Sequence, residues 1–148
     1  MKKLTTLLVL LSVLTFTTFA QETNRRSQMK TGIGLQLIGP TNVAAIEVDY
    51  FITHNFNVEA GAGFYGVYAS AKYYFGKADE AKPLAPYLGF TYKLPELLTG
   101  DSHGVFYFPL GIQLITKGGF TFAPEFAIKR VYSEGTGLWA ALRFGYHF

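Results

Sequence analysis

The sequence predicts an all-β fold, namely an eight-stranded antiparallel up-and-down transmembrane β-barrel. Apolar residues alternate with polar or small residues through eight segments, and successive side chains of a strand point to opposite faces. Charged residues make up 16% of the sequence, against about 25% in soluble domains. After residue 20, no apolar stretch reaches the ~20 residues that a membrane helix needs, so we expect the chain to span a membrane by strands.

Residues 1–20 have the features of a secretory signal peptide. Lys2 and Lys3 form a basic start, and an apolar stretch follows. The small residues that a signal peptidase recognises end at Ala20, so we expect cleavage before Gln21. A membrane-anchoring helix is the alternative, but the stretch contains six Thr and Ser residues and has roughly 16 residues against the ~20 required. No cysteine follows the site, which argues against a lipid anchor.

Removal of the signal peptide leaves 148 − 20 = 128 residues, the size of one domain. It also lowers the formal charge from +3 to +1, so the charge gives no reason to expect a nucleic-acid partner. The absence of cysteine excludes disulfides and a thiol nucleophile. Residues 21–28 are polar and contain Arg25 and Arg26, and we expect them to form a flexible lead-in to the barrel at 29–148.

The predicted strands are separated by turn signals, and most have roughly nine to eleven residues, the length that crosses a bilayer when tilted. They are expected at 29–38, 43–52, 56–64, 67–76, 84–94, 105–115, 120–130 and 138–148. The turns between them include Gly39-Pro40-Thr41-Asn42, Thr53-His54-Asn55, Tyr65-Gly66 and Lys117-Gly118-Gly119. An even number of strands returns the chain to the end of the barrel where it began.

The alternation predicts one apolar face without charge and one polar face rich in glycine. The apolar face includes Ile46, Val48, Phe90, Leu110 and Phe126. The polar face carries Gln36, Glu47, Asp49, Asn57, Glu59, Ser70, Lys72, Thr91, Lys93, Gln113, Glu125, Lys129 and Arg143, together with Gly32, Gly34, Gly61, Gly63, Gly89, Gly111 and Gly145.

The face that points inward decides between two kinds of barrel. A lipocalin-like soluble barrel would enclose the apolar face around a ligand, whereas a membrane barrel would turn it towards lipid. Eight charges over eight strands are too few for a surface in water, and the glycines suit the narrow interior of an eight-stranded barrel. Outward aromatic residues would also gather at one rim, as at a membrane interface: Tyr50, Phe56, Tyr73, Phe75, Phe120, Phe122, Tyr146 and Phe148. We therefore expect the apolar face to contact lipid.

The last predicted strand alternates from Leu138 through Tyr146 and stops at Phe148. With the signal peptide, this pattern resembles the small bacterial outer-membrane β-barrels of the OmpA/OmpX type, which typically end on an aromatic residue, usually Phe. The resemblance implies export through the periplasm to the outer membrane of a Gram-negative envelope, with Phe148 as an assembly signal. It also implies outer-membrane lipid and the barrel assembly machinery as partners, for a porin-like barrel that we expect to be a monomer. The longest predicted surface loop has about ten residues, so we do not expect partner capture through long loops.

The predicted interior charges balance, with four acidic residues against four basic ones: Glu47, Asp49, Glu59 and Glu125 against Lys72, Lys93, Lys129 and Arg143. A two-residue turn at 65–66 would set Glu59 opposite Lys72, and a three-residue turn at 53–55 would set Asp49 opposite Glu59. The same counting around the last loop sets Glu125 opposite Arg143. One interpretation is a salt-bridged plug with a structural or barrier role. The other is a narrow path for ions or small solutes, which the small bore of eight strands disfavours.

Enzymatic chemistry has weaker support in the sequence. Outer-membrane enzymes that modify lipid A use Ser, His and acidic residues on similar barrels, and here Ser102 and His103 are adjacent, near Asp101 and Glu96. Adjacent residues of an extended segment point apart, so they do not predict a nucleophile–base pair. Asp101 and His103 are also too few ligands for a metal site in a loop. We therefore expect no catalytic residue, no cofactor and no metal.

Overall fold

The computed structural model describes residues 24–76, 82–94, 104–131 and 135–148. The predicted signal peptide and the first part of the predicted lead-in lie outside the described residues. Among the described residues, no helix is long and apolar enough to cross a membrane.

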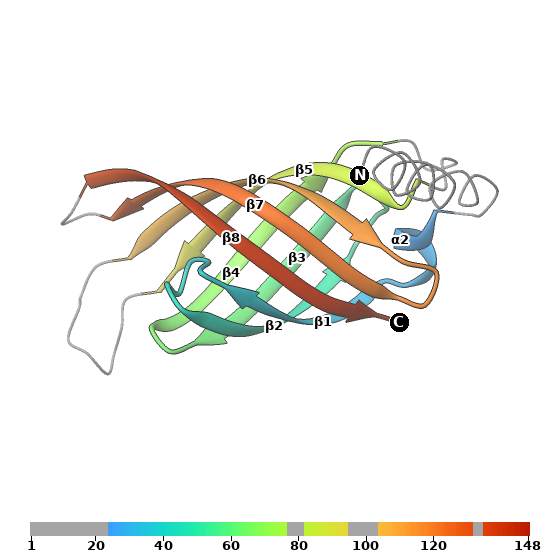
Figure 1. Cartoon of the computed structure of the whole chain (residues 1–148), viewed down its shortest axis with the longest axis horizontal. Helices are drawn as coiled ribbons and strands as arrows, with labels where there is room; N and C mark the ends of the chain where they lie inside the picture. The colour runs from blue at the N-terminus through green and yellow to red at the C-terminus, as the bar shows by residue number, and fades with distance from the viewer. Residues whose placement is uncertain (1–23, 77–81, 95–103, 132–134) are drawn as a thin grey trace, which may run out of the picture.

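Eight antiparallel strands follow one another around a closed barrel (Figure 1). They are β1 (Thr31–Leu37), β2 (Ala44–Phe51), β3 (Phe56–Gly63), β4 (Gly66–Tyr74), β5 (Leu84–Lys93), β6 (Val105–Ile115), β7 (Phe120–Val131) and β8 (Gly135–His147). The last strand pairs with β7 on one side and with β1 on the other, where Gly32 lies opposite His147. The predicted eight-stranded antiparallel barrel is confirmed.

The two ends of the barrel carry different parts of the chain. The C-terminus lies at one end with the last residues of β2, β4 and β6 and the first residues of β3, β5 and β7, and we call it the terminal end. The last residues of β1, β3, β5 and β7 and the first residues of β2, β4, β6 and β8 are at the opposite end, which we call the loop end (Figure 1).

One predicted register is confirmed and another is wrong. Asp49 lies opposite Glu59 in the β2–β3 pair, as expected. In the β7–β8 pair, however, Glu125 lies opposite Ala141, two positions from Arg143. The reason is that β8 begins three residues earlier than predicted, inside the expected loop, so the last connection is shorter and the strands pair further along.

The β3–β4 register also differs from the prediction by two residues. Lys72 lies opposite Asn57 and not opposite Glu59. The turn is formed by residues 64–65 because Gly66 has a φ of 111°, a left-handed conformation that glycine adopts without steric cost. A shift of two residues keeps every side chain on its predicted face.

The predicted faces agree with the structure. The side chains assigned to the polar face are buried: Gln36, Glu47, Asp49, Asn57, Glu59, Ser70, Lys72, Thr91, Lys93, Gln113, Glu125, Lys129 and Arg143. The apolar face points outward, where Ile46, Leu110 and Phe126 are 72%, 61% and 74% exposed. Interior glycines make room for large side chains, since a Cβ at Gly61 would overlap the ring of Tyr68.

A one-turn helix, α2 (Arg25–Gln28), precedes β1 where we expected a flexible lead-in. The side chain of Asn24 caps it by accepting a hydrogen bond from the backbone N–H of Arg26 at 3.1 Å. Asn24 and both arginines are buried, whereas the other two helix residues are exposed. The polar composition predicted solvation, but one side of this segment packs against the terminal end of the barrel.

Candidate functional site in the barrel interior

Arg143 on β8 is the centre of an ion-paired cluster inside the barrel. Its Nη2 lies 2.6 Å from Asp49 Oδ1, its Nη1 lies 3.4 Å from Glu59 Oε2, and its Nε pairs with Glu47. Glu47 and Asp49 are two residues apart on β2, and Glu59 is opposite Asp49 on β3, so strand register groups the three carboxylates. Arg143 reaches them across β1, which lies between β8 and β2. None of the four side chains is more than 2% exposed. Close opposite charges offset the large cost of removing each ion from water.

Lys72 on β4 connects this cluster to β7. Its Nζ lies 2.9 Å from Glu59 Oε2 and 2.9 Å from Glu125 Oε1. Strands β4 and β7 are not neighbours, so the second contact crosses the interior. Glu125 also accepts hydrogen bonds from Tyr87 Oη at 2.6 Å and from Gln36 Nε2 at 3.0 Å. We call the six connected charged residues the central network: Glu47, Asp49, Glu59, Lys72, Glu125 and Arg143.

The structure brings together one predicted pair and separates another. Glu59 and Lys72 are in contact although they are not directly opposite, because long side chains reach diagonal neighbours on adjacent strands. The prediction of Glu125 opposite Arg143 is wrong. Glu125 pairs with Lys72, and Arg143 pairs with carboxylates of β2 and β3.

Neutral side chains supply further hydrogen bonds to the carboxylates. Tyr68 Oη lies 2.7 Å from Glu47 Oε2. Asn57 Nδ2 donates to Asp49 Oδ2 at 2.6 Å, and His147 Nε2 lies 2.9 Å from the same oxygen. Glu47, Asp49 and Glu125 are therefore held by both charged and neutral partners, as buried polar groups require.

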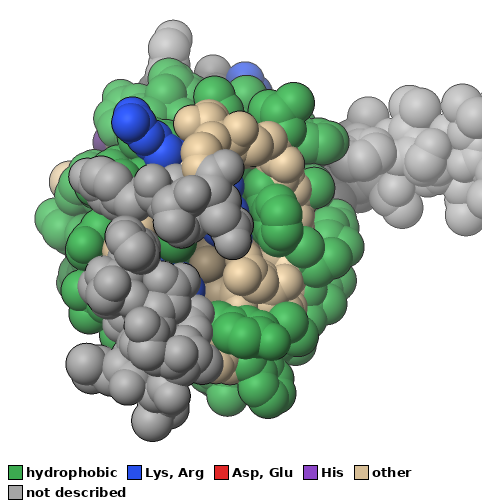
Figure 2. Space-filling view, turned by 90° about the vertical axis from the view of Figure 1, so that its left-hand side faces the viewer, with side chains coloured by type: hydrophobic (Ala, Val, Ile, Leu, Met, Phe, Trp, Pro, Cys, Tyr) green, Lys and Arg blue, Asp and Glu red, His purple; other side chains and the backbone are tan. Residues whose placement is uncertain are grey.

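The two other predicted interior bases lie at the loop end. Lys93 Nζ donates to the backbone oxygen of Tyr65 at 2.8 Å. Lys129 Nζ hydrogen-bonds Asn42 Oδ1 and lies 4.4 Å from the centre of the Trp139 ring. Figure 2, which looks at this end, shows basic side chains near the mouth and hydrophobic side chains around it. The four bases are thus divided between the central network and the loop end.

A layer of aromatic rings separates the central network from the terminal end. The ring of Tyr74 lies 5.2 Å from that of Phe51 and 4.8 Å from that of Tyr87, measured between centroids. The Phe51 ring lies 5.5 Å from the imidazole of His147. Phe51 and Tyr74 follow Asp49 and Lys72 by two residues on their strands, so the layer is directly next to the network.

The arginines of α2 cover this aromatic layer. Arg25 Nη1 donates to the backbone oxygen of Ile115 at 2.7 Å, and Arg26 Cζ lies 5.4 Å from the centre of the Tyr74 ring. Burial lowers the pKa of the Arg26 guanidinium, and the neighbouring Tyr74 acts in the opposite direction.

Sequence reasoning did not assign the interior aromatic residues or the contact of His147 with Asp49. Tyr and Phe count as apolar in a hydrophobicity pattern, so they do not mark the polar face. A usable signal was nevertheless present, because each of four aromatic residues lies two positions from a predicted interior residue on its strand: Phe51, Tyr68, Tyr74 and Tyr87.

The candidates for catalysis and metal binding lie mostly outside the described residues. This is the case for Glu96, Asp101, Ser102 and His103. In the part of the chain that the structure describes, no group of three His, Cys, Asp or Glu residues could hold a metal ion.

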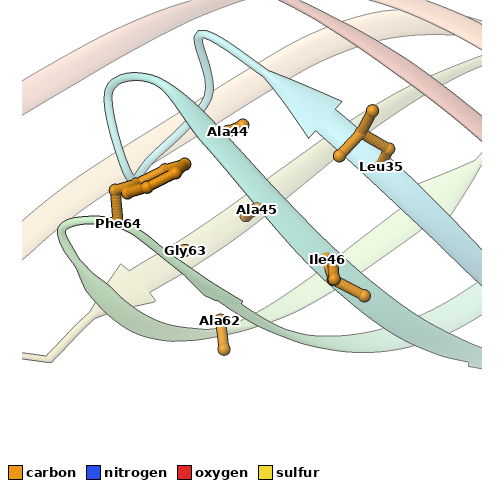
Figure 3. Close-up of a pocket in the computed structure, with 7 residues that line it drawn as sticks. All are labelled: Leu35, Ala44, Ala45, Ile46, Ala62, Gly63 and Phe64. Carbon is orange, nitrogen blue, oxygen red and sulfur yellow. The ribbon is translucent and has the colours of Figure 1, made fainter.

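The outer wall has a hollow of about 450 Å³ over β1, β2 and β3 near the loop end (Figure 3). Leu35, Ile46 and Phe64 surround smaller residues in the close-up. Its seven lining residues carry neither a charged nor a hydrogen-bonding side chain: Leu35, Ala44, Ala45, Ile46, Ala62, Gly63 and Phe64. The hollow is therefore a feature of the apolar surface and offers no chemistry of its own.

No protein-family model matches the sequence, and no curated protein matches it. Among solved structures, the chain is similar to the N-terminal β-barrel domain of OprF from Pseudomonas aeruginosa. The TM-score is 0.60 and the sequence identity is 16%, over 86% of this chain and 100% of that one. At this identity the similarity concerns the fold, which is a β-barrel in both chains.

Proposed function

We propose that this protein is a non-catalytic integral barrel of the outer membrane, with a structural or barrier role and an interior closed by the central network. The observation that carries the proposal is the set of ion pairs that connects β2, β3, β4, β7 and β8 through the interior. An eight-stranded barrel has an interior that side chains can fill. Here those side chains are paired charges, large aromatic rings and glycines that make room for both.

The outward face supports a position in a bilayer. Of the charged residues within the described strands, Arg130 is the one that is exposed on this face, and it lies near the loop end of β7. Charged residues on the lipid face cost little near the interface and most at the midplane. The predicted aromatic rim also lies at one end, as shown by Phe56 opposite Tyr73 and Phe120 opposite Tyr146. This arrangement suits a membrane interface.

A narrow ion or small-solute channel is the second candidate, and the charge distribution favours it. The central network has four carboxylates and two bases, which sum to −4 + 2 = −2 when His147 is neutral. Such an interior would attract cations if water could enter it.

Planar-bilayer recordings decide between these two functions. We expect no steady conductance above that of a protein-free bilayer. A stable conductance with a cation-selective reversal potential would replace the barrier role by the channel. A lipid A mass spectrum that changes when the protein is present would instead support a lipid-modifying enzyme.

The last residue provides a test of the proposed location. Phe148 N–H donates to the Thr31 oxygen at 2.9 Å, and Thr31 N–H donates back at 3.3 Å, so Phe148 takes part in the β1–β8 seam. We expect its deletion to impair assembly and to leave misfolded protein in the periplasm. Normal outer-membrane fractionation with normal heat-modifiable gel migration of the deletion variant would contradict its role as an assembly signal.

A further inference from the structure

The arginines of α2 lie at the end of the barrel nearer to the central network, whose formal charge is negative. The central network sums to −2, and Arg25 with Arg26 add +2, so these eight groups together are neutral. Lys93 and Lys129 lie at the opposite end of the barrel. Attraction between opposite charges is strong where water is excluded, so the acidic interior gives α2 a reason to dock at the terminal end.

Arg26 is held differently from Arg143, although both guanidinium groups are buried. Arg143 contacts three carboxylates. Arg26 lies against the ring of Tyr74, and its Nε and Nη2 have no hydrogen-bond partner among the described residues. A buried donor without a partner loses its hydration and gains nothing in exchange. The docked state of α2 is therefore less firmly held than the central network.

The helix is also too short to persist when it leaves the barrel. It has four residues, whereas isolated helices shorter than about 12 residues are marginal in water. Its structure consequently depends on docking, and undocking would return residues 24–28 to the solvated state that their polar composition favours.

We propose that residues 24–28 form a displaceable cork that closes the terminal mouth of the barrel and, when released, admits water and small cations as far as the aromatic layer beneath it. We call this segment the terminal cork. The inference rests on the proposed function, because the central network remains as the barrier deeper inside. Release of the terminal cork exposes the aromatic layer to water, whereas the interior beyond Arg143 stays closed.

An introduced thiol can report on the terminal cork because the chain contains no cysteine. Ala85 is 1% exposed and belongs to the buried layer with Tyr74, Tyr87 and Ile115. We therefore choose Ala85→Cys in the full barrel and measure its modification rate with a cationic methanethiosulfonate reagent. We expect slow modification in the parent and a rate at least about tenfold higher once Arg25→Ala and Arg26→Ala are combined, because local opening governs access to buried groups.

Two controls separate loss of the cork from a general effect on the helix. Ser27→Ala with Gln28→Ala changes the exposed residues of α2 and should leave the rate unchanged. The arginine substitutions should raise the modification rate less for an anionic reagent of similar size than for the cationic one, because the central network is negatively charged. In the parent with Ala85→Cys, a higher salt concentration should also speed modification by an uncharged reagent, since screening weakens the attraction of α2 and leaves the encounter with such a reagent unchanged. The salt dependence tests the terminal cork even if the double arginine variant does not fold, because both arginines are present in the protein that is measured.

A second thiol distinguishes failure of the cork from failure of the proposed function. Ala141 is 4% exposed and lies opposite Glu125, on the loop side of Arg143. Ala141→Cys should stay protected with or without the two arginines. Equal rates at Ala85→Cys with and without the arginines, and no effect of salt, would overturn the terminal cork. Rapid modification of Ala141→Cys in the parent would instead show a water-filled interior and overturn the barrier role.

Discussion

Neighbouring residues of one strand meet two different environments in this barrel. On β6, the side chain of Leu110 is 61% exposed on the outer wall, while Gly111 beside it lies under the ring of Tyr87. Outward residues away from the loop end are mostly apolar and need no hydrogen-bond partner within the barrel. Inward residues are charged, neutral polar, aromatic or very small, and each depends on the identity or the volume of the residues around it. An outward position is therefore specified by polarity alone, and an inward position by its particular neighbours.

The largest effect is expected inside the barrel, at Lys72. Lys72→Met leaves Glu125 with neutral hydrogen-bond partners, whereas Glu59 keeps Arg143. Removing one member of a buried ion pair costs about 3–5 kcal/mol. Urea unfolding in detergent would measure the loss.

The partner left without a counter-charge can be identified by a second substitution. Adding Glu125→Gln to Lys72→Met should recover more stability than adding Glu59→Gln, because Glu59 retains a base. The contrary result is a small loss of unfolding free energy for Lys72→Met that simply adds to the loss from either second substitution. It would mean that water screens these charges, so that inward positions depend on their neighbours less than we infer.

The next largest effect is expected on the outer wall. Leu110 is in the middle of β6, and Leu110→Arg should cost about 2–4 kcal/mol if it meets the bilayer midplane. Leu138→Arg is the matched control, since Leu138 lies near the loop end and the cost should be about 0–1 kcal/mol there. Folding in lipid vesicles followed by urea unfolding measures both. If Leu110→Arg folds as well as the parent, the outer wall does not face lipid.

A smaller effect is expected where the interior has no spare volume. Gly111→Ala would place a Cβ against the Tyr87 ring and the Pro124 oxygen, and overpacking of this kind costs about 1–3 kcal/mol. Gly137→Ala is the control, because nothing lies within 4 Å of its added Cβ. Thermal unfolding of the two variants should differ, and equal stabilities would show that the interior has room to adjust.

The smallest effect is expected from one hydroxyl group. Tyr68→Phe removes a hydrogen bond to Glu47 but leaves the pairing of Glu47 with Arg143, so the loss should be about 1 kcal/mol. Tyr146→Phe removes a hydroxyl from the outward face, where Tyr146 is 50% exposed, and should change little. If urea unfolding shows an equal loss of stability for the two variants, then an inward hydroxyl group contributes no more to stability than an outward one.

The face of the polar residues could be predicted from the sequence, but not every partner. A period of two assigns the faces once the strands are located, which is why the buried polar residues agree with the prediction. Partners depend on turn length, and the turn before β4 and the loop before β8 were each misplaced. A shift of two residues keeps the face and changes the opposite residue. This explains why the position of Glu125 inside the barrel was predicted and its partner was not.

The docking of α2 could not be predicted for a related reason. Counting all interior charges together gave a balance, and that balance left no role for Arg25 and Arg26. The structure divides the bases along the barrel axis, with Lys93 and Lys129 at the loop end. The position along the axis follows from strand register, which hydrophobic alternation does not specify.

The most direct test of the two-faced wall compares Ala140 with Ala141, which are adjacent on β8. Ala140 is exposed on the outer wall and Ala141 is buried inside. A nitroxide label on a cysteine at each position, in lipid vesicles, reports collisions with dissolved oxygen and with a water-soluble nickel chelate. We predict frequent collisions with oxygen and few with nickel at position 140, and an immobilised label that collides with neither at position 141. Frequent nickel collisions at position 140 would place the outer wall in water, and frequent nickel collisions at position 141 would show an open, water-filled interior; either result would contradict this account.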